Sequence, residues 1–354
     1  MKKKICVIFG GESTEYEISL KSAFSVLEKL DKSIYDIITV GITKTGKWYL
    51  YDGDYEKIPT DSWYDDNLSS VSLMHGSKES CMAVFSPDGT YKKVYFDVAF
   101  PVLHGKNGED GTIQGLFEIA GIKYVGVGVI ASSVGMDKTF TKIIFKNAGI
   151  PQANWVVIAK HEMTSLDEKI AQIEAALGYP VFIKPANAGS SIGIGKAKNR
   201  DELLAAINEA MKFDRKILVE EFLTGHEVEC AVLGNRGNIQ ASCVGEIVAS
   251  QEFYTYDAKY ASDSKSELYI PAKIDNVYAQ KVRENAIKAF EALDGKGLSR
   301  VDFFVDEAKG KVCINEINTL PGFTSISMYP KLFEASGIEY TELLTKLIEI
   351  ALED

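Results

Sequence analysis

The chain has 354 residues, 46% of them apolar and 25% charged, and these values are typical of a soluble globular protein with two or three domains. Its 50 acidic residues outnumber the 39 basic ones and give a net charge of -11. This charge argues against a general nucleic-acid or anionic-membrane surface, both of which need basic patches, but it permits a local basic pocket for a phosphate-bearing small molecule.

The N-terminal region, which we expect to span 1–125, begins like a doubly wound α/β domain. Residues 4–9 form a short apolar run typical of a strand buried on both faces, and a pair of glycines ends it. A capping-box pattern from Thr14 to Glu17 then predicts the start of a helix. Ligands of such folds bind beyond the carboxyl ends of the strands, although the G-x-G-x-x-G pattern of a dinucleotide site is missing.

Two polar residues near the ends of predicted strands are candidate site residues. Glu15 falls at the start of the predicted helix, where its carboxylate would either stabilise the helix end or bind a ligand. His104 lies at the end of an apolar strand predicted over 93–105, and it would be either a satisfied structural histidine or part of a site. Both alternatives stay open for each residue.

The central region, expected over 126–216, reads as a helix over 132–149 followed by a compact β-α-β-β-α-β unit. Lys184 ends the apolar strand PVFIKP, and a turn rich in glycine and serine follows it. Small residues let backbone N–H groups approach phosphate oxygens and lysine adds a point charge, so this turn is a candidate phosphate-binding site. It lacks the Walker A pattern, and an ordinary hairpin turn is the alternative.

The remaining region, expected over 217–354, opens with two glutamates on either side of an apolar turn. Glu220 and Glu227 would suit an adenosine pocket in which a carboxylate binds the ribose hydroxyls, and surface acids at strand ends are the alternative. Residues 251–268 then form a long aromatic and polar segment between strands. Loops of this length are uncommon in compact domains unless they are lids or disordered, and the aromatic residues favour a mobile lid.

Residues 298–323 read as two strands joined by a short turn, and they carry a candidate metal site. Because side chains alternate along a strand, Arg300 and Asp302 share one face of the first strand, while Glu316 and Asn318 share one face of the second. Pairing Asp302 with Glu316 brings all four together and implies a loop of about five residues around 307–311. Two carboxylates and an amide oxygen suit Mg²⁺, and a solvated polar hairpin face is the alternative.

The five cysteines are far apart and show no C-x-x-C spacing. Several lie in apolar strand-like runs, so we expect buried thiols in a reducing compartment. The lysines at 2–4 precede an apolar run that is too short for a signal sequence, and no stretch of the sequence approaches the length of a membrane span. We therefore expect a cytoplasmic protein.

The chain resembles the ATP-grasp superfamily and, within it, the D-alanine-D-alanine ligase family. The resemblance rests on eight motifs that follow one another in register across nearly the whole length. They are GGESTEYEISLKS, HGKNGEDGTIQG, GMDKTFTK, FIKPANAGSSIG, VEEFLTGHEVE, YDAKYASD, SRVDFF and NEINTLPGFTSISMYP. The resemblance implies a mixed α/β fold with an N-terminal, a central and a C-terminal domain, and ATP bound between the last two.

The resemblance also implies which residues would bind the substrates. Glu15 would orient the ammonium group of the first D-alanine, with Ser190 beside it. Lys138 and Lys184 would hold the phosphates of ATP, and the region of Ser191 would cover them. The adenosine pocket would be formed by Glu220, Phe222, Leu223 and Glu227.

Further residues at matching positions would form the catalytic apparatus. Arg300 and the backbone N–H of Gly322 would form an oxyanion hole, and Lys259 and Tyr260 would lie on the mobile loop. Two Mg²⁺ ions, for which Mn²⁺ could substitute, would be bound by Asp302, Glu316 and Asn318. The residues on the substrate side would be Ser327, Met328 and His104.

Two positions bear on the second substrate. Lactate-forming relatives tend to have a histidine where this chain has Tyr260, and resistance-type enzymes tend to have arginine where it has Met328. Both differences favour D-alanine as the acceptor, with D-serine as the alternative, in the synthesis of a peptidoglycan precursor. A ligase for another carboxylate and a nucleotide-binding protein without turnover are the rival interpretations. The family suggests a homodimer built through the N-terminal domain, with no nucleic-acid or membrane partner.

Overall fold

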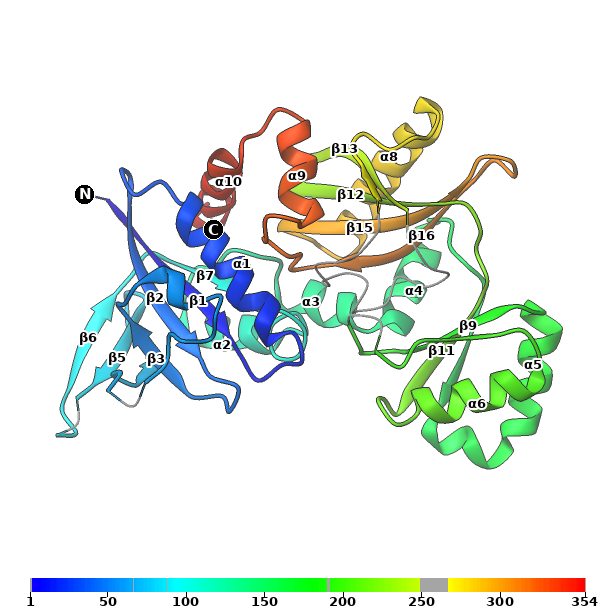
Figure 1. Cartoon of the computed structure of the whole chain (residues 1–354), viewed down its shortest axis with the longest axis horizontal. Helices are drawn as coiled ribbons and strands as arrows, with labels where there is room; N and C mark the ends of the chain where they lie inside the picture. The colour runs from blue at the N-terminus through cyan, green and yellow to red at the C-terminus, as the bar shows by residue number, and fades with distance from the viewer. Residues whose placement is uncertain (1, 66, 87, 190–191, 249–266, 354) are drawn as a thin grey trace.

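The computed structural model of the chain describes residues 2–65, 67–86, 88–189, 192–248 and 267–353. Ser190, Ser191, Lys259 and Tyr260 therefore lie outside the described residues, as does the expected mobile loop up to residue 266. Within the described parts of the chain the strands form four sheets, and helices pack on the N-terminal, central and C-terminal ones (Figure 1). The expected mixed α/β class is confirmed.

The N-terminal sheet has the strand order β3-β2-β1-β7. The central strand β1 pairs in parallel with β2 and β7, so the carboxyl ends of β1 and β7 lie at the same edge. Glu15 occupies the N-cap position of the following helix, but its side chain makes no capping hydrogen bond. The elements of this part are β1 (Lys3–Gly10), α1 (Tyr16–Lys29), β2 (Tyr35–Ile42), β3 (Trp48–Tyr51), η1 (Tyr55–Lys57), β7 (Val98–Val102) and α2 (Thr112–Ala120).

A second, small sheet lies beside the first, and it corrects one expectation. The single strand predicted over 93–105 is wrong, because the chain there forms β6 and β7 in two different sheets. Asp97 separates them: its backbone N–H donates to Lys4 O and its carboxylate accepts from Lys4 N, both at 2.8 Å. The strands of the small sheet are β4 (Val71–Leu73), β5 (Cys81–Phe85) and β6 (Tyr91–Tyr95).

The central part confirms the expected β-α-β-β-α-β order and corrects the helix before it. The helix predicted over 132–149 is two helices, because Asp137 is extended and caps the second one by accepting hydrogen bonds from Thr139 N and Phe140 N. The elements are α3 (Val129–Met136), α4 (Lys138–Asn147), β8 (Trp155–Ala159), η2 (Lys160–Ser165), α5 (Leu166–Leu177), β9 (Val181–Pro185), β10 (Gly195–Ala197), α6 (Arg200–Ala210) and β11 (Lys216–Glu221).

The C-terminal part is built on an antiparallel sheet of order β14-β13-β12-β15-β16. Helix α8 packs on four of these strands, and α9 packs on β12 and β13. The elements are β12 (His226–Asn235), β13 (Asn238–Val248), β14 (Glu267–Tyr269), α8 (Asn276–Ala292), β15 (Gly297–Asp306), β16 (Lys311–Asn318), α9 (Met328–Ala335) and α10 (Tyr340–Leu352).

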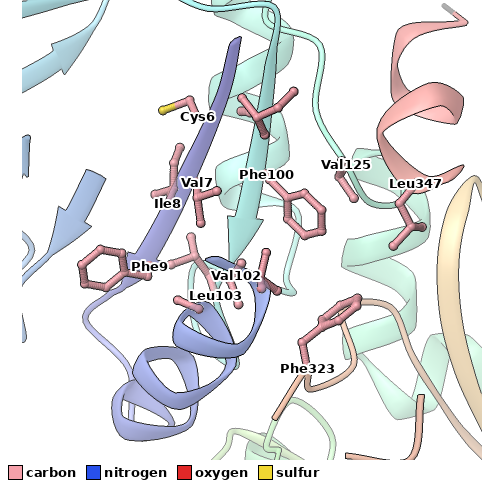
Figure 2. Packing of buried hydrophobic residues seen from close by; sticks show 14 of the residues in the cluster. Cys6, Val7, Ile8, Phe9, Phe100, Val102, Leu103, Val125, Phe323 and Leu347 are labelled. Atoms are coloured by element: carbon pink, nitrogen blue, oxygen red, sulfur yellow. The ribbon is translucent and has the colours of Figure 1, made fainter. Parts of the chain in front are cut away.

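One hydrophobic core joins the N-terminal sheet to the C-terminal helices. Phe100 of β7 and Phe323, which follows β16, meet edge to face with their ring centroids 6.1 Å apart (Figure 2). Leu347 of α10 belongs to the same buried cluster. The loop before α9 is therefore anchored on the N-terminal sheet. Separate clusters lie under α8 and within the central part.

Four of the five cysteines are buried and the fifth, Cys243, is partly buried, as expected of structural thiols. Among the described residues, the helices are all too short or too polar to cross a bilayer.

Candidate active site

Three acidic residues form a row across adjacent strands of the C-terminal sheet. Glu229 of β12 lies opposite Asp302 of β15, and Asp302 lies opposite Glu316 of β16. In the next row Arg300 lies opposite Asn318. The predicted pairing of Asp302 with Glu316 is thus confirmed, and Glu229 extends the row by a residue that we did not predict.

A β-bulge at Asn315 shapes this face of the sheet. Asp302 pairs with Glu316 but Phe303 pairs with Ile314, so Asn315 is the extra residue. The hairpin loop consequently covers only 307–310, one residue less than predicted, because the additional residue lies within β16. Asn315 and Glu316 are both partly exposed, and the amide oxygen of Asn315 accepts a hydrogen bond of 3.0 Å from Lys184 Nζ.

Two carboxylates flank the guanidinium group of Arg300. Arg300 Nε and Nη2 donate to the two oxygens of Asp302 at 2.8 and 2.7 Å, and Nε also lies 3.0 Å from Glu229 Oε2. All three side chains are largely buried. Burial alone would lower the pKa of Arg300, but Asp302 and Glu229 raise it well above its ordinary value. Arg300 is therefore a fixed cation at the site.

The chemistry of the expected Mg²⁺ ligands fits that ion. The described parts of the chain hold no cluster of three or more His, Cys, Asp or Glu side chains arranged around a metal position. Mg²⁺, however, is usually held by only one or two carboxylates and takes its other ligands from phosphates and water. Asp302 and Glu316 supply two facing carboxylates, which are balanced here by Arg300 and by Lys138 Nζ, 3.7 Å from Glu316. Asn318 Nδ2 donates to Asp302 at 3.1 Å.

Lys138 is the first residue of α4, so the break in the predicted helix positions it. Its Nζ donates to Ala188 O at 2.8 Å. Helix N-termini favour anions, because their backbone N–H groups and the helix dipole point outward there. Lys138 thus adds a cation to a place that already suits phosphate.

A buried ion triplet holds the second lysine. Glu220 contacts Lys184 Nζ at 2.7 Å and Lys142 Nζ at 2.5 Å. Burial alone would raise the pKa of Glu220, but the two lysines lower it to about 2. Burial would lower the pKa of Lys184, but Glu220 raises it above its ordinary value. Within this structure Glu220 therefore acts as the counter-charge of two lysines, of which Lys142 was not predicted.

The residues expected around adenosine line the end of β11 and the start of β12. The ring of Phe222 stacks on Phe182 with centroids 5.6 Å apart, and Lys196 Nζ lies 4.1 Å from the Phe222 centroid. Leu223 is partly exposed, and Glu227 lies opposite Phe304 in the sheet. These side chains offer a flat apolar wall with an acid nearby.

Glu15 lies between two glycine backbones from different parts of the chain. A Cβ on Gly105 would come within 2.5 Å of Glu15 Oε2, and one on Gly189 within 3.0 Å. Any larger residue at either position would displace the carboxylate. Glu109, which we did not predict, accepts a hydrogen bond of 2.8 Å from Gly105 N. Burial and the nearby Glu15 raise the pKa of Glu109 well above its ordinary value.

His104 makes structural contacts with both ring nitrogens. Its Nδ1 lies 3.1 Å from Leu320 O and its Nε2 lies 3.2 Å from Ser22 Oγ. Because a carbonyl only accepts, Nδ1 carries the proton and Nε2 accepts from Ser22. Ser22 Oγ in turn accepts from Phe323 N at 3.2 Å. The network ties α1 and the end of β7 to the residues on both sides of Gly322.

The expected residues near the second substrate follow Gly322. A Cβ on Gly322 would lie 2.8 Å from Ser327 Oγ, so the two are neighbours. Ser327 Oγ also accepts from Thr324 N at 3.0 Å. Met328 is only 5% exposed, and the end of its side chain lies over Gly245.

Several site residues escaped prediction from the sequence. Glu229 and Lys142 carried a local signal in the sequence. The alternation in HEVEC places Glu229 on the same strand face as the predicted Glu227, and Lys142 lies one helical turn from the predicted Lys138. Asn315 and Ser22 carried none, because a bulge and a distant hydrogen bond leave no periodic pattern.

The sequence was compared with family models and with known proteins, and both kinds of comparison give matches over most of the chain. A family model described as D-ala D-ala ligase N-terminus matches residues 4–127, and one described as D-ala D-ala ligase C-terminus matches 144–349. The D-alanine-D-alanine ligase of Ruminiclostridium cellulolyticum is 52% identical, over 99% of this chain and 96% of its own.

Two solved structures are similar to the whole chain. The VanG D-Ala:D-Ser ligase from Enterococcus faecalis has a TM-score of 0.90 and 42% identity, covering 99% of this chain and 100% of its own. The D-alanine-D-alanine ligase from Coxiella burnetii has a TM-score of 0.83 and 33% identity, covering 99% and 94%.

Proposed function

The chain belongs to the D-alanine-D-alanine ligase family and has its ATP-grasp fold, and from this premise we propose how its residues divide the work of the reaction. The enzyme is an ATP-dependent ligase of peptidoglycan precursor synthesis, and it joins two D-alanines with release of ADP and phosphate. Because the reaction consumes ATP, we place it in the cytoplasm.

One observation carries the proposed division of work. The two lysines expected to bind phosphate come from the central part of the chain, yet both reach the strand that carries the expected metal ligands. Lys184 donates to Asn315, and Lys138 lies 3.7 Å from Glu316. Cations and acids of this kind converge where a nucleotide's phosphates and their Mg²⁺ would both need partners.

The first step activates a carboxylate, which is a poor electrophile at neutral pH. A carboxylate oxygen of the first D-alanine attacks the γ-phosphorus of ATP, the bond to ADP breaks, and an acyl phosphate forms. Lys138 and Lys184 neutralise charge on the phosphoryl oxygens, and Glu15 holds the ammonium group. Mg²⁺ bound by Asp302, Glu316 and Asn318 would supply further neutralisation of phosphate charge.

The second step forms the peptide bond. The neutral amine of the second D-alanine attacks the acyl carbon, and the carbonyl oxygen becomes an oxyanion. Arg300 and the Gly322 N–H stabilise this oxyanion, each donor contributing about 2.7–4 kcal/mol. The intermediate then expels phosphate, and the amine loses its proton. The network of Ser22 and His104 holds the loop that carries Gly322.

D-serine is the second candidate acceptor. It is favoured by the similarity to a solved D-Ala:D-Ser ligase, whereas the relative that is 52% identical is named for D-alanine. We keep the division of the chain into 1–125, 126–216 and 217–354 as a proposal, and the change of family model between residues 127 and 144 supports its first boundary. From the family we also propose a homodimer built through the N-terminal domain. Sedimentation would test the dimer.

The deciding experiment measures phosphate release with D-alanine alone and then with D-serine or D-lactate added, with products identified by mass. We expect phosphate release that depends on D-alanine, and the alanyl dipeptide as the main product even when D-serine is present. A dominant mixed product would transfer the assignment to the D-serine alternative. Phosphate release that ignores D-alanine would contradict the proposed function.

A further inference from the structure

Glu229 is a buried acid beside the proposed catalytic arginine, and no step of the reaction above uses it. It lies in β12 directly opposite Asp302 and is only 4% exposed. Its Oε2 lies 3.0 Å from Arg300 Nε, but the Nε–H bond is directed at Asp302 Oδ1, 2.8 Å away. Glu229 therefore contacts the guanidinium as a counter-charge beside the fork-shaped pair that Asp302 makes.

The charges of this row explain why the contact matters. Acids directly opposite each other in a sheet repel, and a buried carboxylate without a cation is costly. Glu229 and Asp302 can face each other because Arg300 lies between them. Both carboxylates lie within ion-pair distance of Arg300.

The two carboxylates are not equivalent. Asp302 also faces Glu316 and accepts from Asn318, so it is shared between the arginine and the proposed Mg²⁺ site. Glu229 is separated from Glu316 by Asp302, and the described residues hold no group of three or more acids, histidines or cysteines arranged around one metal position. If the carboxylate oxygens of Asp302 bind a cation, Glu229 remains as the acid that pairs with Arg300.

We infer that Glu229 is a positioning residue that fixes the guanidinium of Arg300 at the oxyanion hole while Asp302 serves the metal. The inference rests on the role proposed for Arg300. Glu229 acts through the arginine and does not touch the substrates. Residues of this kind orient a group that contacts the reacting atoms without contacting them themselves. Their loss commonly lowers activity about 10- to 100-fold.

The first test is a kinetic double-mutant cycle with Glu229→Gln and Arg300→Ala. Gln keeps the shape of the side chain and removes its charge. We expect E229Q to lower kcat about 10-fold or more and to change the KM for ATP less than about threefold, because ATP does not contact Arg300 in the proposed arrangement. In the Arg300→Ala background the same change should lower kcat less than about twofold, since the residue it positions is gone.

The matched control is Glu246→Gln. Glu246 is equally buried at 4%, lies in the neighbouring strand β13, and pairs with His226 Nδ1 at 2.6 Å on the other face of the sheet. Its substitution removes a buried charge from the same sheet, so it reports general damage. We expect its kcat to stay within about twofold of the native value.

A second readout needs neither substrate nor Mg²⁺. Urea unfolding of the ligand-free single and double variants should show coupling, with the double variant losing less stability than the two single variants together. If Glu229→Gln does not fold, Glu229→Asp replaces it in the same cycles. Its carboxylate lies one methylene farther from Arg300, and we expect it to lower kcat as well.

The outcomes separate the inference from the proposed function. If Arg300→Ala leaves kcat unchanged, the oxyanion role itself fails. If Arg300→Ala lowers kcat but E229Q does not, or if E229Q costs as much without Arg300 as with it, the positioning role of Glu229 is overturned and the proposed function stands.

Discussion

Asp302 accepts two hydrogen bonds from Arg300 and one from Asn318, so its oxygens are occupied by donors before any cation arrives. Replacing it with Asn keeps the shape but removes the charge that a hard cation needs. We expect Asp302→Asn to raise the Mg²⁺ concentration for half-maximal activity about tenfold, as measured by titrating phosphate release with Mg²⁺.

Asp306 on the same strand provides the control for this measurement. It pairs with Lys309 at 2.8 Å, away from the acidic row. Asp306→Asn should therefore leave the Mg²⁺ response unchanged. An unaltered Mg²⁺ requirement in Asp302→Asn would remove Asp302 from the metal site.

Lys142 shows how a buried lysine can act without touching a substrate. With Lys184 it lowers the pKa of Glu220 from 4.5 to about 2, so the ionised glutamate stabilises the fold above pH 4.5 and loses this effect as the pH falls toward 2. Lys142→Met should lower the free energy of unfolding at pH 7 by about 1–3 kcal/mol. This is less than the loss expected when a buried acid loses its whole counter-charge, because Lys184 still pairs with Glu220. The difference from the native protein should narrow below pH 4.5 in urea unfolding.

Lys146 is the matched lysine for this comparison. Its Nζ and that of Lys142 both lie 5.5 Å from the ring centroid of Trp155, but Lys146 is exposed. Lys146→Met should change stability by less than about 0.5 kcal/mol. An equal loss in both variants would show that the ring contact, and not Glu220, accounts for the effect of Lys142.

At the scale of an element, the bulge in β16 lies between side chains of the core and side chains of the site. Before the bulge, Val312 and Ile314 pack in the core under α8; after it, Glu316 lies near Lys138 and Asn318 donates to Asp302. Deleting Asn315 would join Ile314 to Glu316 in the register that their partners Phe303 and Asp302 already have, so both pairs would keep their faces. We therefore expect the deletion to cost about 1 kcal/mol, like Asn315→Ala, because both variants lose the one hydrogen bond from Lys184.

Urea unfolding followed by circular dichroism would measure both variants. The deletion variant should also be about as active as Asn315→Ala, since the acidic residues and the core keep their faces. A deletion variant that is much less stable or less active than Asn315→Ala would mean that the local bend of the bulge itself is needed to orient the acidic residues.

The same elements show what the sequence could predict. Strand and helix periods revealed the β-α-β-β-α-β unit and the pairing of Asp302 with Glu316, because both depend on local alternation. The split at Asp137 was missed because the apolar pattern of the helix continues across it, and capping by that residue wins over the pattern. The bulge was missed because a single inserted residue leaves each half-strand with an ordinary alternation.

At the scale of the whole molecule, the sequence did not predict that its two ends share a core. Phe100 and Phe323 are more than two hundred residues apart in the chain, and their contact places the Gly322 loop on the N-terminal sheet. Periodicity reports that each ring is buried and says nothing about which distant residue buries it. The motifs of the family predict Gly322 as a candidate site residue, and the structure shows which contacts hold its loop.

The pH dependence of stability tests this link between the ends of the chain. His104 is buried, and burial outweighs Glu15 and lowers its pKa below 6.5, so the folded protein holds it neutral with Nε2 accepting from Ser22. The unfolded chain binds the proton more readily. Stability is therefore complete above pH 6.5 and falls as the pH drops from there through the lowered pKa. His104→Gln, which cannot titrate, should flatten this part of the curve of unfolding free energy against pH.

His75 lies exposed near the small sheet, and His75→Gln supplies the control for the loss of a histidine side chain. The loss of the His104 contacts should also appear in catalysis, because Leu320 and Phe323 flank Gly322 and are held through His104 and Ser22. We expect Ser22→Ala to lower kcat more than it raises the KM for ATP. A native slope in His104→Gln, or an unchanged kcat in Ser22→Ala, would show that the core around Phe323 holds the loop without this network.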